Sequence, residues 1–145
     1  MSNDLIAITN LLYRYAETMD SGDLQGAAAL FRHARIKVPG CDTYLDEAGI
    51  LRIWQQRLII YPCGTPRTRH IISNPIIDID DASARATVRS YYTVLQAPPG
   101  HPLQPIAAGR YHDEFERIDQ QWRFSFRDYS LLDLAGDLGH HLNGR

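Results

Sequence analysis

The order of hydrophobic and polar residues changes along the chain from a helical to an extended pattern. Between residues 4 and 19 apolar side chains recur about every 3.6 positions, which predicts an amphipathic helix. Gly22 ends this helix, and a second amphipathic stretch begins within a few residues and continues to Phe31. The pattern therefore predicts a helical hairpin with Asp20 at its turn.

The rest of the chain is mostly extended. A short strand at residues 35–39 and a third helix at residues 46–59 come first. Further strands are predicted at residues 70–79, 84–96, 106–118 and 122–128. Pro75 cannot donate to a ladder, so it predicts an edge position or a bulge in the first of these strands. Short turns between consecutive strands indicate an antiparallel meander. The tail beyond residue 131 has no clear pattern.

Helices that precede a set of strands are typical of the α+β class. We expect one domain over residues 1–145, because a chain of this length can bury a core without disulfides or metal. A strongly curved, antiparallel or mixed sheet wrapped around the N-terminal helices would form a cone-shaped barrel with one mouth. The cone would enclose a pocket.

Composition excludes several classes of function. The net charge is −2, from 15 basic and 17 acidic residues, and no basic run is present, so nucleic acid is not an expected partner. No apolar run approaches the roughly 18 residues of a membrane span, and the N-terminus lacks the pattern of a signal peptide. We therefore expect a cytoplasmic protein with no membrane partner. Cys41 and Cys63 are isolated, which indicates reduced, structural cysteines.

The strand that begins at His70 has an unusual inner face. Side chains alternate along a strand, so His70, Ile72, Asn74 and Ile76 are expected to share one face. A mostly apolar face with a few polar groups suits the wall of a ligand pocket. Imidazole has an unperturbed pKa of about 6.5 and is well suited to accept a proton near neutral pH. A carboxylate bonded to its other nitrogen would fix the tautomer and stabilise the imidazolium.

Two motifs carry a resemblance to a known family. They read LYRYxxxxDxGD at residues 12–23 and YHDEFERIDxxWRF at residues 111–124. Together with the order of elements, they resemble the SnoaL-like branch of the nuclear transport factor 2-like superfamily, which includes scytalone dehydratase and bile-acid dehydratase. The resemblance covers nearly the whole chain. It implies the cone-shaped fold, but it does not by itself define a reaction, because the superfamily contains both enzymes and non-catalytic subunits.

The resemblance also implies a site. Its catalytic members carry an aspartate at the end of the first helix and a histidine on the strand after the third helix, and these positions correspond to Asp20 and His70. A tyrosine five residues before the aspartate corresponds to Tyr15. The implied function is a cofactor-independent lyase or isomerase that acts by dehydratase-like proton abstraction on a small hydrophobic cyclic molecule. His70 would be the base, Asp20 would orient it, and Tyr15 would donate a hydrogen bond to the developing oxyanion.

Each of these residues also has a structural interpretation. Asp20 could cap the helical hairpin, His70 could be a buried histidine with satisfied hydrogen bonds, and Tyr15 could belong to the core. Helical geometry places Tyr13 nearer to Asp20 in angle than Tyr15 is, so Tyr13 competes for the role of the phenol.

Further residues are candidates for substrate binding. They are Tyr13, Trp54, Asn74, Tyr92, His112 and Arg127. Alternation places His112 on the opposite face from Tyr111, so only one of the two can line the cavity. Arg127 is expected to share a face with Arg123 and Ser125, and would hold a carboxylate or carbonyl of the substrate. The alternative for Arg127 is a solvated or interface arginine.

No metal or cofactor is expected. The six histidines show no spacing that offers converging ligands, and no glycine-rich phosphate loop is present.

Two non-catalytic functions remain open beside the enzyme. One is an assembly subunit, since the Trp122-Arg123-Phe124 hairpin resembles that of the small subunit of ring-hydroxylating dioxygenases. The other is a protein that binds a hydrophobic metabolite without changing it. The resemblance further implies association through the open face of the sheet, as a homodimer or homotrimer.

Overall fold

The helices and strands follow one another in the predicted order. In the computed structural model, which describes residues 2–143, they are α1 (Ser2–Asp20), α2 (Leu24–Ala29), β1 (Arg35–Lys37), α3 (Glu47–Arg57), β2 (Thr68–Asp80), β3 (Arg85–Gln96), β4 (Gln104–Ile118), β5 (Gln121–Asp128) and β6 (Leu132–Ala135). The predicted α+β class is confirmed. Strand β6 lies in the tail, where the sequence had no clear pattern.

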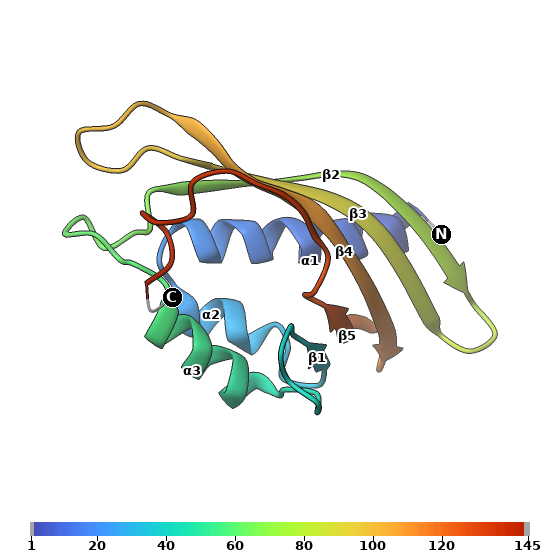
Figure 1. Ribbon diagram of the computed structural model, residues 1–145. Coiled ribbons are helices and arrows are strands. Elements are labelled where there is room, and N and C mark those ends of the chain that lie inside the picture. Colours follow the sequence, from blue (N-terminus) through green and yellow to red (C-terminus); the bar gives the residue numbers. More distant parts are fainter. Residues whose placement is uncertain (1, 144–145) are drawn as a thin grey trace.

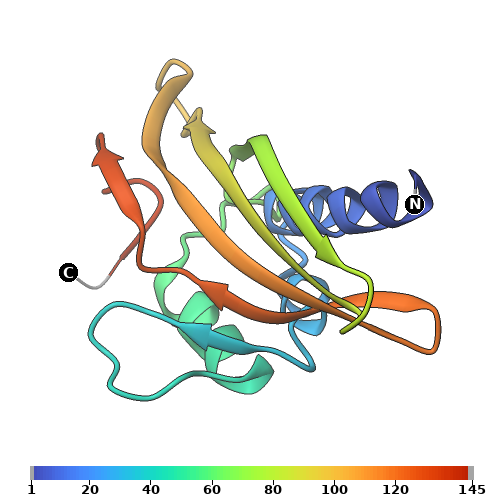
Figure 2. The ribbon, with the colours of Figure 1, turned by 90° about the vertical axis from the view of Figure 1, so that its right-hand side faces the viewer.

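The strands form one curved, unclosed sheet with the order β1-β5-β4-β3-β2, and β6 pairs with β4. The pairs β2–β3, β3–β4, β4–β5 and β4–β6 are antiparallel, whereas β1 pairs with β5 in parallel. Figure 1 shows the sheet bent over the labelled helices, with α1 beneath β2 and β3. Figure 2 shows β1 beside β5 at one edge and β2 at the other. The helices therefore fill the concave side of the sheet.

The apolar stripe of α1 enters the core from Ile8 onward, whereas Leu5, which the periodicity also placed in it, is 46% exposed. Ile8, Leu12, Tyr15 and Met19 are each at most 3% exposed. Residues at this spacing lie on one face of a helix, so burying them turns the opposite face toward solvent.

The short loops position the helices. Asp23 caps α2 by accepting from the Gly26 N–H at 2.9 Å, and Asp46 caps α3 through the Gly49 N–H at the same distance. Gly22 follows α1 at φ +81, where a Cβ would lie 2.1 Å from the Gly64 carbonyl oxygen. The end of α1 is thereby held against the loop that leads into β2.

Bulges change which side chains face the helices. In β2 the register shifts between Ser73 and Ile76, and Asn74 has φ +55. The predicted bulge or edge position at Pro75 is confirmed in both respects, because β2 is also the edge strand. The expectation that Asn74 shares a face with His70 is wrong, since an extra residue in a strand reverses the alternation after it.

A second bulge reverses the end of β5. Phe124 pairs with Phe115 and Phe126 pairs with Glu114, which leaves Ser125 outside the ladder. Arg127 consequently points into the core, 0% exposed. The prediction that Arg127 shares a face with Arg123 is therefore wrong, since Arg123 instead pairs with Glu116 at 2.8 Å.

Among residues 2–143 no helix is both long and apolar enough to cross a membrane. Cys41 and Cys63 are free thiols at exposed positions.

Candidate functional site

The end of α1 and the start of β2 bring a carboxylate and an imidazole together. Asp20 Oδ1 lies 2.6 Å from His70 Nδ1, and Asp20 Oδ2 accepts the backbone N–H of His70 at 2.7 Å. Thr68 Oγ1 donates to Asp20 Oδ1 at 2.9 Å. The contact predicted from the sequence is therefore present, and the carboxylate is held at both oxygens.

These bonds determine which nitrogen of His70 is available. An ionised carboxylate only accepts hydrogen bonds, so Nδ1 carries the proton that it shares with Asp20. The neutral ring then has its lone pair on Nε2, which has no protein partner within the described residues. Only 6% of the His70 side chain and 12% of the Asp20 side chain are exposed. The pair combines an oriented imidazole with a nitrogen free to accept a proton.

His70 lines a cavity on the concave side of the sheet, with a volume of about 620 Å³. Tyr15, Trp54 and Tyr92 also line it. Most of the remaining lining is aliphatic, from Met19, Val38, Pro39, Ile50, Ile53, Leu58, Val94, Ala107, Leu132, Leu138 and Leu142, and Cys41, Gln56 and Arg57 add a thiol, an amide and a guanidinium. Its size and apolar wall suit a small organic ligand.

Tyr15 lies next to His70 within this wall. The two rings meet edge to face, with centroids 6.1 Å apart, and Tyr15 is 1% exposed. Burial raises the pKa of Tyr15 to about 12, although the Arg127 charge and a hydrogen bond from Tyr111 act in the opposite direction. Tyr15 is therefore a neutral phenol near neutral pH. Its ring also belongs to the core, since it contacts Phe31 and Trp54.

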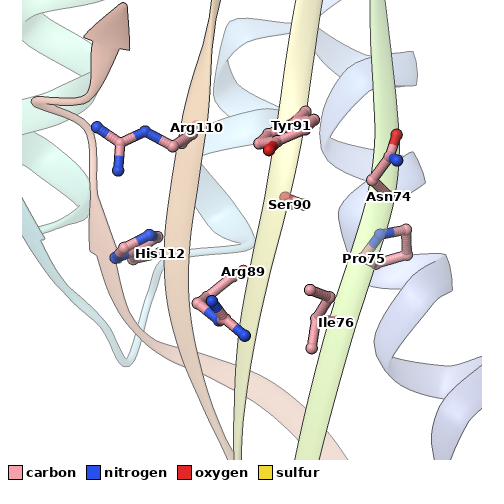
Figure 3. Close-up of a pocket in the computed structure, with 8 residues that line it drawn as sticks. All are labelled: Asn74, Pro75, Ile76, Arg89, Ser90, Tyr91, Arg110 and His112. Carbon is pink, nitrogen blue, oxygen red and sulfur yellow. The ribbon is translucent and has the colours of Figure 1, made fainter.

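Four of the six candidate binding residues, Tyr13, Asn74, His112 and Arg127, do not line the cavity. Tyr13 is 46% exposed and lines a second groove with Asp20 and His70, so His70 borders both this groove and the cavity. Asn74 and His112 line a shallow groove on the other face of the sheet, together with residues that include Tyr91 and Arg110 (Figure 3). The strand alternation that left His112 and Tyr111 as alternatives is decided in favour of Tyr111, which is 2% exposed and lines the cavity.

Arg127 is occupied by a protein carboxylate. Its Nε and Nη2 donate to the two oxygens of Asp113 at 2.7 and 3.0 Å, and both side chains are fully buried. The guanidinium carbon lies 3.8 Å from the centre of the Tyr111 ring and 4.4 Å from that of Tyr15. Burial opposes the charge, but the Asp113 carboxylate outweighs it and raises the pKa of Arg127. Arg127 therefore lies behind the aromatic wall, and its charge is paired with Asp113.

Sequence reasoning missed several polar residues of the site, among them Gln56 and Arg57 on α3. Thr68 precedes His70 by two positions and so shares its face, a signal that was available from strand alternation. Tyr129 and His141 line the cavity, but they follow β5 and lie in a tail without periodicity. Burial lowers the pKa of His141 to about 4, with a further contribution from the nearby His70.

Within residues 2–143 no three His, Cys, Asp or Glu side chains gather in a way that could hold a metal ion.

Comparison with protein families gives a match over residues 1–128 to the SnoaL-like domain. The chain belongs to the SnoaL-like family. The match includes Asp20, His70 and the whole of β2 to β5. The segment that carries Tyr129 and His141 follows it. Comparison with curated proteins gives no match.

Solved structures show the same fold. A Mycobacterium tuberculosis protein of unknown function is 22% identical to this SnoaL-like chain, with a TM-score of 0.72. The superposition covers 92% of this chain and 78% of the Mycobacterium tuberculosis protein. A provisionally assigned scytalone dehydratase from Novosphingobium aromaticivorans is 22% identical, with a TM-score of 0.70. The superposition covers 94% of this chain and 91% of the dehydratase chain.

The beta subunit of a provisionally assigned aromatic-ring-hydroxylating dioxygenase from Novosphingobium aromaticivorans is 18% identical, with coverage of 93% of both chains and a TM-score of 0.67. At these identities the likeness is one of fold. The same fold therefore occurs in one protein named as an enzyme and in one named as a subunit.

Proposed function

We propose that this SnoaL-like protein is a cofactor-independent lyase or isomerase that abstracts a proton from a small, largely hydrophobic cyclic substrate. The observation that carries the proposal is the orientation of His70, whose Nδ1 is held by Asp20 at 2.6 Å while its ring lines an apolar cavity. Neither assembly nor storage of a ligand requires an imidazole oriented in this way.

The reaction would begin with transfer of a substrate proton to His70 Nε2. The substrate carbon must be acidified by a neighbouring carbonyl or similar group, because imidazole is a weak base. Asp20 stabilises the imidazolium that forms, and Thr68 and the His70 backbone N–H keep the carboxylate in place. Loss of a leaving group would complete an elimination, and return of the proton at another carbon would complete an isomerisation.

Tyr15 is suited to stabilise the charge that develops on the substrate oxygen. Its raised pKa keeps it protonated, so its O–H remains a hydrogen-bond donor near neutral pH. In a largely apolar cavity, such a donor strengthens as negative charge develops. Trp54 and Tyr92 supply flat apolar walls for a ring, which agrees with a cyclic substrate.

The proposal can be tested without the natural substrate. The probe is 2-tetralone, a two-ring ketone with acidic protons next to its carbonyl, in deuterated buffer, with deuterium uptake measured by NMR. We expect the protein to accelerate uptake. Asp20→Asn, which keeps the size of the side chain but removes its charge, should reduce the protein-catalysed rate about 10²–10⁴-fold. His70→Gln should reduce it to the rate of buffer.

The matched control is His33→Gln, which removes an exposed histidine. It should retain the full rate. Circular dichroism and urea unfolding identify variants that have lost the fold. Folded Asp20→Asn and His70→Gln proteins that retain the rate of the original protein would contradict the proposal.

A second candidate function, assembly of copies of this chain, is favoured by the outer face of the sheet. Tyr91 and Ile76 are 55% and 52% exposed there, beside Arg89 and Arg110 (Figure 3). Apolar and arginine side chains on one face are typical of protein interfaces. Light scattering after gel filtration should give a homodimer or homotrimer that Tyr91→Glu dissociates. A monomer at tens of micromolar would contradict this candidate.

A further inference from the structure

One face of α3 lines the cavity and ends in a charged residue. Ile50, Ile53, Trp54 and Arg57 all line the cavity, and their spacing of three and four positions places them on the same side of a helix. Ile50 is 2% exposed and Trp54 is 6% exposed, whereas Arg57, in the last turn, is exposed to solvent. The stripe therefore runs from the buried part of the cavity to its mouth. A guanidinium lies at the mouth, where the spacing would place another apolar side chain.

Arg57 is the only permanently charged side chain among the described residues that line the cavity. No Asp or Glu of residues 2–143 lines it, and none of the ion pairs within these residues includes Arg57. Arg127, which the sequence led us to expect as a partner for a substrate carboxylate, is instead bonded to Asp113. Arg57 is therefore the arginine that the cavity offers to a ligand.

The C-terminal tail fixes the end of α3. The Asn143 N–H donates to the Arg57 carbonyl at 2.8 Å, and the Ile59 N–H donates to the His141 carbonyl at 2.9 Å. Because the backbone on both sides is held, binding of a ligand group has to order only the Arg57 side chain. Gln56 also lines the cavity and adds an amide donor next to the guanidinium along the chain.

We propose that the cavity binds a cyclic acid, with its ring inside and its carboxylate held at the mouth by Arg57. The inference rests on the proposed function in taking this cavity as the substrate site. A guanidinium presents two parallel N–H donors that match the two oxygens of a carboxylate. Burying a negative charge is far more costly than burying an apolar ring, so the carboxylate stays at the mouth, where water also reaches it. A neutral ring compound of the same shape would leave Arg57 without a partner.

Arg57 also lies at the C-terminal end of α3, where a positive charge is favourable with or without a ligand. That interaction stabilises the helix, but it does not discriminate between a charged and a neutral ligand. The test of Arg57 must therefore measure ligand selectivity rather than stability.

Two probes isolate the charge of the ligand from its shape. They are 1,2,3,4-tetrahydro-2-naphthoate and 1,2,3,4-tetrahydro-2-naphthamide, which share one two-ring skeleton and differ in that a carboxylate replaces a neutral carboxamide. Dissociation constants come from isothermal titration calorimetry with the full chain at low ionic strength. We expect the carboxylate to bind at least about fivefold more tightly than the amide. Arg57→Gln should remove this preference by weakening the carboxylate, and should change the affinity for the amide by less than about twofold.

Two further variants separate recognition by Arg57 from a general effect of charge. Arg57→Lys keeps a positive charge at the mouth and should retain part of the preference that Arg57→Gln loses. Arg52→Gln is the matched control, since Arg52 is exposed on the same helix but does not line the cavity. It should leave the preference unchanged. Equal affinity of the original protein for the two probes, no binding of either probe, an unaltered preference in Arg57→Gln, or the same loss in Arg52→Gln would overturn the proposal.

The binding measurement fails separately from the proposed function. If His70 is not a base, deuterium uptake into 2-tetralone does not depend on it, but the preference for the carboxylate persists in His70→Gln. If the role of Arg57 is wrong, the preference is absent or independent of Arg57, while uptake by the original protein still depends on His70 and Asp20.

Discussion

At the scale of single residues, the site depends on one carboxylate that receives three hydrogen bonds. Asp20 accepts from the Thr68 hydroxyl, the His70 backbone and the His70 ring. A carboxylate held in this way cannot turn away from the imidazole, so Thr68 acts as a positioning residue for His70. The pairing of Asp20 with His70 was expected because the resemblance to the SnoaL-like family implies it, and Asp20 stands in one of the motifs that carry that resemblance. Thr68 needed only the alternation of β2.

The role of Thr68 leads to a first prediction. Thr68→Val keeps the shape of the side chain but removes its donor to Asp20. We expect deuterium uptake into 2-tetralone to fall about five- to tenfold, because the carboxylate loses a bond worth about 1–1.5 kcal/mol. Thr68→Ser should restore most of the rate. A Thr68→Val protein with an unchanged rate would show that the carboxylate is held well enough without it.

His141 leads to a prediction about pH. Its pKa in the folded protein is lowered to about 4, first by burial and then by the charge of His70, against an opposing effect of Asp20. Between this value and the ordinary histidine pKa of about 6.5, the unfolded chain binds a proton that the folded protein does not. The free energy of unfolding should therefore fall by about 2 kcal/mol as the pH is lowered from about 7 to about 4.5.

The contribution of His141 is isolated by comparison with His141→Leu. Urea unfolding at both pH values should show a smaller loss for the variant, since leucine does not titrate. Equal losses in the two proteins would assign the pH dependence to other groups.

At the scale of elements, bulges and short links decide which side chains meet. The bulge in β2 turns Asn74 away from His70, and the bulge in β5 turns Arg127 into the core. Neither outcome follows from period-two alternation, because one unpaired residue reverses the faces of everything after it. Pro75 signalled the first bulge, whereas Ser125 carries no comparable signal.

The link between α1 and α2 leads to a prediction for Gly22. Alanine there would adopt φ +81 and place its Cβ 2.1 Å from the Gly64 carbonyl oxygen. Gly100→Ala is the control, since Gly100 has φ +77 but no atom within 4 Å of the position that a Cβ would take. We expect Gly100→Ala to lower the free energy of unfolding by about 1 kcal/mol and Gly22→Ala to lower it by at least about 3 kcal/mol, as measured by urea unfolding. If the two variants lose the same free energy of unfolding, the loop around Gly64 moves aside to accept the added Cβ, and the prediction is wrong.

At the scale of the whole molecule, a buried ion pair lies behind the aromatic wall of the cavity. Arg127 and Asp113 join β5 to β4 without exposure to solvent, and the guanidinium contacts the rings of Tyr15 and Tyr111. Two buried charges are stable only as a pair, because each alone would keep its desolvation cost without compensation. The pair therefore supports the wall from behind.

This arrangement predicts strong coupling between the two residues. Asp113→Leu should lower the free energy of unfolding by about 3–5 kcal/mol, since it leaves the Arg127 charge buried alone. The double variant Asp113→Leu with Arg127→Met should cost less than Asp113→Leu by itself. Urea unfolding of both single variants and the double variant checks this, and additive losses would contradict the coupling.

The sequence by itself determined the order of the elements and the α+β class, and its resemblance to the SnoaL-like family implied the encounter of Asp20 with His70. These depend on local periodicity and on short motifs, which a chain carries wherever it folds. The tertiary structure decided which faces line the cavity, that Arg127 is paired with Asp113, and that Tyr129 and His141 join the wall. Those outcomes depend on bulges and on the packing of a non-periodic tail, where contacts between distant segments replace local pattern.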